Sequence, residues 1–252
     1  MNNLQRKVNW PLGEKYFGKP SSYFKKDVER LKKGEPLDYV IGYIEFLGCR
    51  IDLSKKPFIP RPETEFWVEK AIEDLRFKNY NLRILDMFAG SGCIGIAILK
   101  HIKNAHIVFA EKDIKAVEQI KINLKINQPS LKTSAWQSKI IKSDVFSNVI
   151  YKFSYIFANP PYISQKRRNK IQKSVLKYEP KTALFGGQDG LFYVRKFLAS
   201  AKNFLNPNGK IYMEFDSIQR KKIDKLLKKY NYKKWTFHKD QNGKWRYCIV
   251  KI

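Results

Sequence analysis

The chain has 252 residues, of which 43% are hydrophobic, so it is long enough for one large α/β domain with a small appendage, and extensive disorder is excluded. Its formal net charge of +27 favours weak association with nucleic acid or ribosomes, although a general bias toward surface lysine would give the same value. The few cysteines and histidines are scattered, and no apolar run is long enough to span a bilayer; we therefore expect a cytoplasmic protein with no metal, no disulfide and no membrane contact.

The N-terminal part, residues 1–58, is expected to form a small appendage of one helix and a hairpin. The helix is predicted over residues 21–33, because a serine can cap its start and Gly34, with a proline two residues later, ends it. Residues 37–58 are rich in β-forming side chains and hold two turn glycines. This composition predicts extended backbone that folds back as a hairpin.

Residues 59–252 are expected to form the larger domain. Apolar residues at helical spacing after the stiff Pro60-Arg61-Pro62 loop predict a first helix that starts at Glu63. From Leu82 onward, apolar strands alternate with amphipathic helices, a pattern typical of a parallel sheet covered by helices. The predicted strands are 83–88, 106–110, 139–142, 154–158, 210–215, 233–238 and 245–251, and the predicted helices between and after them are 92–101, 113–127, 191–205 and 217–230. Asn242-Gly243 joins the last two strands and predicts an antiparallel hairpin. The fold class is therefore α/β, a doubly wound, mostly parallel, seven-stranded Rossmann-like sheet that ends in this hairpin.

A turn of small residues, Phe88-Ala89-Gly90-Ser91-Gly92, follows the first strand of this pattern. At that place in a doubly wound sheet, glycines allow a tight turn and a close approach of the backbone to a ligand, and the next helix offers free N–H groups at its start. Gly95 completes the spacing of a dinucleotide fingerprint, whereas the Gly-Lys-Ser/Thr of a phosphate-binding loop is missing. The turn is predicted to bind a cofactor.

Polar side chains follow the next three strands as well. Glu111 lies 19 residues after Gly92, where a carboxylate would meet ribose hydroxyls; the alternative is that Glu111 or Asp113 only caps the next helix. Asp144 follows the third strand and could accept a hydrogen bond from an adenine amino group, and Asn159 ends the fourth strand. Because ligands of such sheets bind at the carboxyl ends of the strands, these residues are predicted to form one site.

The stretch Asn159-Pro160-Pro161-Tyr162 is the most informative motif of the chain. The two prolines end the strand and stiffen the loop, and the asparagine adds a side-chain acceptor beside free backbone carbonyls. Such a rigid set of acceptors suits a planar NH₂ group that must be held during a reaction. Tyr162 offers an aromatic ring, rather than its hydroxyl, for stacking on a planar substrate. The alternative is a strand end followed by an ordinary proline turn.

In this order, the motifs resemble those of class I S-adenosylmethionine-dependent methyltransferases and, more closely, those of the release factor glutamine methyltransferase family. The resemblance covers the chain from about Gly34 to the C-terminus. The segments that carry it are 34–42 with Glu45-Phe46, 60–65, 159–163, Tyr178-Glu179-Pro180, Ala183-Leu184 and 187–191. This sequence departs from the family where Phe88 replaces the usual glycine, and where only about 33 residues precede Gly34 in place of a fuller helical domain.

The resemblance implies an enzyme that methylates the glutamine of the Gly-Gly-Gln motif in peptide chain release factors, with S-adenosyl-L-methionine as cofactor. It also implies roles for single residues. The methionine part of the cofactor would be wrapped by Phe88, Ala89, Gly90, Ser91 and Gly92, the ribose bound by Glu111, the adenine bordered by Asp144 and Val145, and the substrate amide held by Asn159, Pro160, Pro161 and Tyr162. Residues 1–58 would be a shortened docking domain for the protein substrate, and the enzyme is expected to be a monomer.

Other functions fit parts of the same pattern. An adenine-N6 methyltransferase acting on DNA or RNA uses the same Asn-Pro-Pro-Tyr logic and would suit the positive charge. A glutamine methyltransferase of a ribosomal protein and a basic RNA-binding module with a degenerate cofactor pocket are further alternatives. The chain also contains its own Gly186-Gly187-Gln188 triplet, which we interpret as a coincidence rather than a pseudosubstrate.

Overall fold

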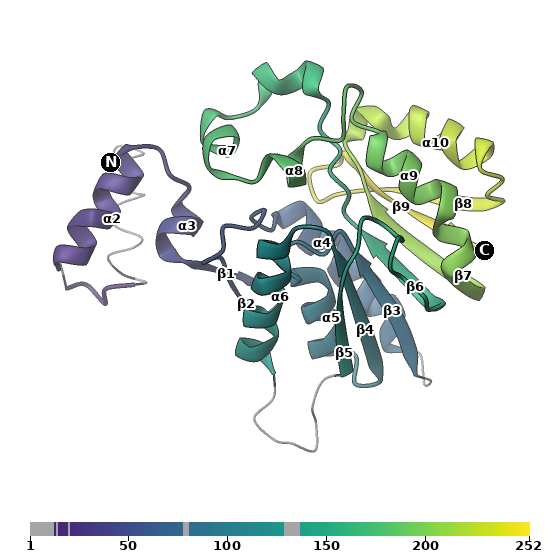
Figure 1. The fold of residues 1–252 in the computed structure, drawn as a ribbon, viewed down its shortest axis with the longest axis horizontal. Helices are drawn as coiled ribbons and strands as arrows, with labels where there is room; N and C mark the ends of the chain where they lie inside the picture. The colour runs from purple at the N-terminus through teal and green to yellow at the C-terminus, as the bar shows by residue number, and fades with distance from the viewer. Residues whose placement is uncertain (1–12, 14, 20, 78–80, 129–136) are drawn as a thin grey trace.

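The central feature of the computed structural model is a seven-stranded sheet covered by helices on both faces (Figure 1). The structure describes residues 13, 15–19, 21–77, 81–128 and 137–252. The strand order is β5-β4-β3-β6-β7-β9-β8; the first five are parallel, and β9 runs antiparallel to both of its neighbours. The strands are β3 (Leu82–Met87), β4 (Ala105–Glu111), β5 (Gln137–Lys142), β6 (Phe153–Ala158), β7 (Leu205–Glu214), β8 (Lys234–Lys239) and β9 (Trp245–Lys251). The predicted fold class is confirmed, including the C-terminal hairpin.

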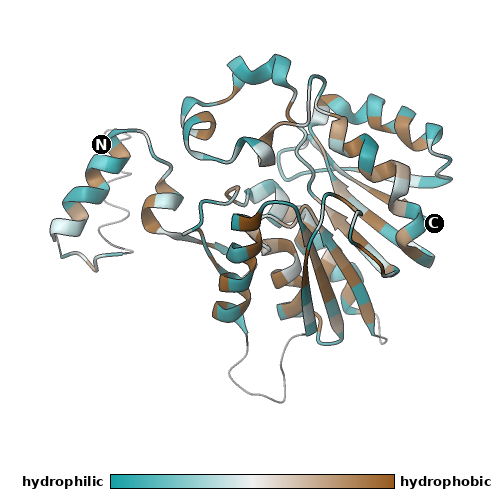
Figure 2. Cartoon of the chain, in the orientation of Figure 1, coloured by the Kyte–Doolittle hydropathy of each residue, from teal (hydrophilic) through white to brown (hydrophobic). Residues whose placement is uncertain are grey.

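Alternating side chains of the parallel strands divide the core into two layers. Ile84, Phe109 and Phe157 point to the layer that contains α4 (Pro62–Arg76), α5 (Cys93–His101) and α6 (Ile114–Asn127). Leu85, Val108 and Ile156 point to the opposite layer, under α9 (Phe192–Ser200) and α10 (Arg220–Lys229). Figure 2 shows the hydrophobic residues gathered in the strands and the hydrophilic ones on the outer helix faces. Burial on both faces explains why these strands are continuous apolar runs.

The helix predictions were right in place but one was wrong in extent. The helix predicted over 191–205 ends at Ser200, and a 3₁₀ turn, η3 (Ala201–Phe204), leads directly into β7 at Leu205. Pro207 disfavours helical backbone at the residue before it, so this stretch joins the sheet instead. A second 3₁₀ turn, η4 (Ser217–Gln219), precedes α10. None of the described helices is long and apolar enough to cross a membrane.

The N-terminal helix and hairpin are present, but residues 37–41 are not extended as predicted. The helix α2 (Ser22–Lys32) is capped by the Ser21 hydroxyl, and a short helix α3 (Leu37–Ile41) follows it. Pro36 has a fixed φ of −54° at the start of α3, and Gly42 ends the helix in the left-handed region with a φ of 99°. The β-forming side chains there are overridden by tertiary contacts, since the Tyr39 hydroxyl donates to the Pro57 carbonyl at 2.5 Å. Residues 1–12, 14 and 20 of the predicted appendage lie outside the described residues.

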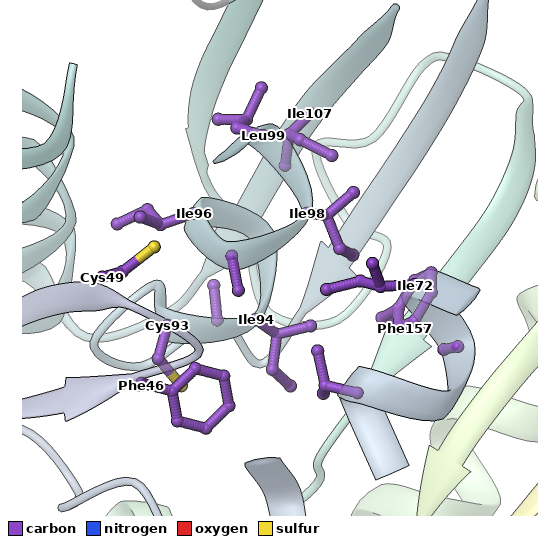
Figure 3. Close-up of a cluster of buried hydrophobic side chains, with 14 of the residues drawn as sticks. Phe46, Cys49, Ile72, Cys93, Ile94, Ile96, Ile98, Leu99, Ile107 and Phe157 are labelled. Carbon is purple, nitrogen blue, oxygen red and sulfur yellow. The ribbon is translucent and has the colours of Figure 1, made fainter. Parts of the chain in front are cut away.

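The hairpin formed by β1 (Tyr43–Phe46) and β2 (Cys49–Asp52) packs against the larger domain. Phe46 and Cys49 are buried in the same cluster as α5 (Figure 3). On α6, the Asn123 amide pairs with both the N–H and the carbonyl of Asp52, at 2.8 and 3.2 Å, and the Asn127 amide pairs with Arg50 in the same way, at 3.0 and 2.8 Å. These side chains replace the peptide groups of a neighbouring strand. The division into domains at residue 58 stays a prediction.

An arch between β6 and α9 was not predicted. It contains η2 (Gln165–Lys170), α7 (Lys173–Tyr178) and α8 (Lys181–Leu184), and it stands above the carboxyl ends of the strands in Figure 1. Its two ends are joined by an isolated parallel bridge between Ile163 and Phe185, in which the Ile163 N–H donates to the Leu184 carbonyl at 2.9 Å. The arch therefore leaves the sheet and returns to the same place.

Candidate functional site

A cavity of about 630 Å³ lies at the carboxyl ends of β3, β4, β5 and β6. The predicted site residues that line it are Phe88, Ala89, Gly90, Ser91, Glu111, Asp144, Val145, Asn159, Pro160, Pro161 and Tyr162. Gly92 is the one predicted residue that does not line it. Four loops far apart in the sequence thus meet at one sheet edge, as parallel strands require. Part of the remaining wall comes from residues 55–58, 60 and 64 and from residues 178–180 and 182–184, which had not been predicted at a site.

The turn after β3 owes its shape to close packing. Gly92 has a φ of 80°, and a Cβ atom there would lie 3.3 Å from the side chains of Ile96 and Ile120. A Cβ atom on Gly95 would lie only 2.3 Å from Cε1 of Phe109, so this glycine lets α5 pack directly on β4. Phe88 has a φ of 60°, in the left-handed region, which costs a residue other than glycine about 1–2 kcal/mol. Its ring packs against Tyr193, with ring centroids 6.0 Å apart.

Glu111 holds this turn from the next strand. One carboxylate oxygen accepts from the Gly90 N–H at 2.8 Å, and the other accepts from the N–H groups of Lys112 and Asp113 at 2.7 and 2.8 Å. Burial raises the pKa of Glu111, whereas the three N–H donors act in the opposite direction. Asp113, as the alternative interpretation held, caps α6, since its carboxylate accepts from the Lys115 N–H. Two carboxylate oxygens offer about four acceptor positions, so Glu111 retains capacity for a ligand hydroxyl.

Asp144 lies at the cavity but is paired with two lysines. Its carboxylate oxygens are 3.0 Å from Lys112 Nζ and 3.0 Å from Lys196 Nζ, and these contacts, that with Lys112 first, lower the pKa of Asp144. An adenine amino group would therefore share this carboxylate with Lys112 and Lys196. Val145, next to it, has a φ of 57° and is buried.

Asn159 is held by a chain of hydrogen bonds that ends at a buried carboxylate. Its Nδ2 atom donates to the Thr64 hydroxyl at 3.3 Å, and this hydroxyl donates to Glu214 at 2.7 Å. Glu214, which is 1% exposed, also accepts from Trp67 Nε1 at 2.7 Å and from the Tyr162 hydroxyl at 2.9 Å. Within the described residues, nothing donates to Asn159 Oδ1 or to the Pro160 carbonyl.

Three residues of the site were not predicted from the sequence, namely Thr64, Trp67 and Glu214. Thr64 and Glu214 are 150 residues apart in the sequence, so only the fold brings them together. One signal was available, because Glu214 is an acidic residue at the carboxyl end of an otherwise apolar strand segment. Tyr162 was predicted to act through its ring alone, whereas its hydroxyl also donates to the buried Glu214.

The arch is fastened to the N-terminal side of the cavity by a buried ion pair. Arg61 contacts the Glu179 carboxylate at 2.5 Å, and the Ile59 N–H donates to the same carboxylate at 3.2 Å. This pair joins two of the segments that form the remaining wall. Gln188 of the Gly-Gly-Gln triplet is exposed and is not among the residues that line the cavity. In the described part of the chain, no three His, Cys, Asp or Glu side chains lie close enough together to hold a metal ion.

Comparison with known proteins identifies the family. The model of the methyltransferase small domain matches residues 71–188. The release factor glutamine methyltransferase of Flavobacterium psychrophilum is 35% identical over 217 residues, which are 85% of this chain and 74% of that protein. The enzyme of the same name from Lactococcus lactis subsp. lactis is 34% identical over 224 residues, covering 88% of this chain and 80% of that protein. The chain belongs to the release factor glutamine methyltransferase family.

Solved structures support the fold of this family member. A methyltransferase from Pyrococcus furiosus superimposes with a TM-score of 0.58 at 19% identity, covering 81% of this chain and 88% of that one. The ribosomal protein L11 methylase of Lactobacillus delbrueckii subsp. bulgaricus gives a TM-score of 0.55 at 17% identity, covering 78% and 81% of the two chains. The chain is thus a methyltransferase of this fold, and its cofactor is S-adenosylmethionine.

The residues at the cavity fit this cofactor. A volume of about 630 Å³ lies within the roughly 300–1,000 Å³ of typical ligand sites. The Glu111 carboxylate sits at the end of the second parallel strand, beside the glycine turn, with acceptor capacity left for the ribose hydroxyls. When bound, the cofactor supplies an electrophilic methyl group on a positively charged sulfur.

Proposed function

We propose that this protein transfers a methyl group from S-adenosylmethionine to the side-chain amide nitrogen of the glutamine in the Gly-Gly-Gln motif of a peptide chain release factor. Membership of the family supports the substrate. The observation that carries the chemistry is the orientation of Asn159. Its NH₂ group is occupied by Thr64, so its Oδ1 atom is free to accept, next to the free carbonyl of Pro160.

These two acceptors match the two N–H bonds of a glutamine amide. An amide nitrogen is a weak nucleophile because its lone pair is delocalised into the carbonyl, so position matters more than proton transfer. With both N–H bonds held, the nitrogen faces the methyl carbon, and orientation of this kind lowers a barrier by at most roughly 7–11 kcal/mol. As the nitrogen takes the methyl group, the bond of this group to the cofactor sulfur would break; the nitrogen then becomes acidic and its proton passes to solvent. A dedicated general base is therefore not required.

The other predicted residues take supporting roles in this proposal. Glu111 binds the ribose hydroxyls, the turn from Phe88 to Gly92 encloses the methionine part, and Asp144 with Val145 borders the adenine. The Tyr162 ring lies along the amide plane. The partner is the release factor itself, which places the reaction in the cytoplasm, and the enzyme acts as a monomer.

A side-by-side transfer assay tests the substrate. Labelled S-adenosylmethionine is offered with release factor, ribosomal protein, RNA and DNA, each at the same concentration. We expect label in the release factor, on the glutamine of its Gly-Gly-Gln motif by peptide mass spectrometry. Label in adenine of nucleic acid, with none in the release factor, would instead establish the adenine-N6 alternative.

Replacing Asn159 by alanine tests the chemistry. The change removes one of the two acceptors, so methyl transfer should fall by about 100-fold or more, while calorimetry shows little change in cofactor affinity. Asn203→Ala is the matched control, since Asn203 is exposed on η3, away from the cavity. Near wild-type transfer by Asn159→Ala would refute the proposed role.

A further inference from the structure

The buried carboxylate of Glu214 accepts hydrogen bonds from Thr64, Trp67 and Tyr162, and the mechanism above assigns no task to these contacts. Glu214 is the last residue of β7, and Thr64 and Trp67 lie in the first turns of α4. Three donors face one carboxylate that is 1% exposed. A buried carboxylate is costly unless it is well hydrogen-bonded, so replacement by an apolar residue would be the simpler solution for stability alone.

The directions of these hydrogen bonds are fixed by chemistry. The indole N–H of Trp67 can only donate, so the oxygen it faces must accept. Burial raises the pKa of Glu214, whereas the three donors that point at its two oxygens act in the opposite direction and favour the ionised form, which has no proton to give. The Thr64 hydroxyl has one proton, and this proton is directed at Glu214 at 2.7 Å. Toward Asn159, Thr64 can therefore only accept.

The acceptor role of Thr64 determines which end of the Asn159 amide faces the cavity. An amide has a donor end and an acceptor end that differ little in shape, so packing alone does not decide which end faces the substrate. Because Thr64 accepts, the NH₂ end must turn toward it, and Oδ1 must turn away. If Thr64 were a donor instead, the NH₂ group of Asn159 would face the N–H bonds of the substrate and repel them.

We propose that Glu214 and Thr64 are positioning residues, which set the polarity of the Asn159 side chain through a one-way chain of hydrogen bonds. This inference rests on the proposed function, since it explains how the acceptor for the substrate amide is presented. The same carboxylate accepts from the Tyr162 hydroxyl, so one buried acid orients both polar side chains of the Asn-Pro-Pro-Tyr loop, that of Asn159 through Thr64 and that of Tyr162 directly. Neither Glu214 nor Thr64 exchanges a proton with the substrate.

Two substitutions at Thr64 separate polarity from packing. Thr64→Val keeps the shape and removes the hydroxyl, so Asn159 can present either end, whereas Thr64→Ser keeps the hydroxyl. We expect Thr64→Val to lower kcat by roughly 10- to 100-fold, with the cofactor affinity measured by calorimetry changed less than about twofold. Thr64→Ser should retain kcat within about threefold. Thr236→Val, on the exposed side of β8, is the matched control and should match the wild type.

The assay also distinguishes failure of this inference from failure of the proposed function. Every variant is measured on a release factor that the wild-type enzyme methylates; if the wild type does not methylate it, the proposed function fails first. If the wild type is active and Thr64→Val has the same kcat, the chain of hydrogen bonds has no positioning role. An equal loss in Thr64→Ser and Thr64→Val would show that packing matters instead, and would also overturn the inference.

Glu214→Leu gives a second test that does not depend on a change at Thr64. Trp67 and Thr64 donate to one oxygen of Glu214 and Tyr162 to the other, so a glutamine could satisfy all three, whereas leucine leaves the Thr64 hydroxyl without its acceptor. We expect a larger loss of kcat than in Thr64→Val, together with a lower thermal midpoint. Circular dichroism and cofactor binding establish that the variant is folded. A folded, cofactor-binding Glu214→Leu enzyme with wild-type kcat would contradict the proposal.

Discussion

Replacement of Glu111 should weaken cofactor binding and loosen the turn that encloses the cofactor. In the structure, its carboxylate joins the end of β4 to Gly90 and to the start of α6 through three short hydrogen bonds. Glu111→Ala removes all three. Glu111→Gln keeps the size of the side chain, but its NH₂ group must face at least one backbone N–H. Both variants should therefore be impaired, and the conservative change should not restore function.

The three hydrogen bonds of Glu111 determine how large the losses of stability and of cofactor affinity should be. A hydrogen bond to a charged group contributes about 1.5–3 kcal/mol, so three set an upper limit of roughly 5–9 kcal/mol. Glu111 is partly exposed, and water can reach the freed N–H groups; its partial burial also has a desolvation cost that the variants no longer carry. We expect a loss of unfolding free energy of about 2–3 kcal/mol for Glu111→Ala. Cofactor binding should weaken by about 1–3 kcal/mol, which is roughly 5- to 150-fold in Kd.

Urea unfolding measures the first quantity and titration calorimetry with S-adenosylmethionine the second. Glu118→Gln is the control, because Glu118 lies on α6 and forms only an exposed ion pair with Lys55, worth at most about 1 kcal/mol. A folded Glu111→Ala protein with unchanged cofactor affinity would refute the assignment of this carboxylate to the ribose. A Glu111→Gln variant as stable as the wild type would refute the account of the three N–H donors.

Three further predictions concern the turn after β3 and the residues packed around it. Gly95→Ala should destabilise the protein by about 1–3 kcal/mol in urea unfolding, because the added Cβ atom would overlap the Phe109 ring, although alanine is ordinarily the better helix former. Gly95→Ala combined with Phe109→Leu should recover part of this loss. No recovery would exclude the clash as its cause. Phe88→Gly should be more stable than Phe88→Ala by about 0.5–1 kcal/mol, since relief of the left-handed strain of about 1–2 kcal/mol outweighs the higher chain entropy of glycine; the opposite order of thermal midpoints would contradict this. Cofactor affinity should decrease as the pH falls toward 5, which is still above the ordinary glutamate pKa of 4.5, because burial raises the pKa of Glu111 and only its ionised form accepts from both ribose hydroxyls. A calorimetric affinity that does not change with pH, or the same pH dependence in Glu111→Gln, would argue against this role.

Strand periodicity and turn chemistry made the sheet predictable. The buried parallel strands are apolar on both faces, so their sequence runs are hard to mistake, and Asn242-Gly243 marks the C-terminal hairpin. The segment 37–41 was predicted as extended from its side chains, yet Pro36 and Gly42 define a short helix there. Its backbone conformation depends on a contact between Tyr39 and Pro57, which no local sequence pattern predicts.

The candidate site could likewise be predicted only in part. Residues that follow strands, such as Glu111 and Asn159, could be predicted to meet, because the topology of a parallel sheet brings strand ends together. The lysine partners of Asp144 and the contact between Thr64 and Glu214 depend on side-chain directions in elements far apart in the sequence. A single sequence holds no signal for such pairs beyond the presence of a lone acid in an apolar strand.

The paired amides of α6 occupy the open edge of the N-terminal hairpin. A two-stranded hairpin leaves the outer N–H and carbonyl groups of each strand open, and such an edge is a template for another strand. On β2, the open groups of Arg50 and Asp52 are already occupied by Asn127 and Asn123, which lie one helical turn apart on α6. The helix thus closes the β2 edge as a third strand would. Loss of either asparagine amide would leave the N–H and the carbonyl of one β2 residue open to pairing with another strand.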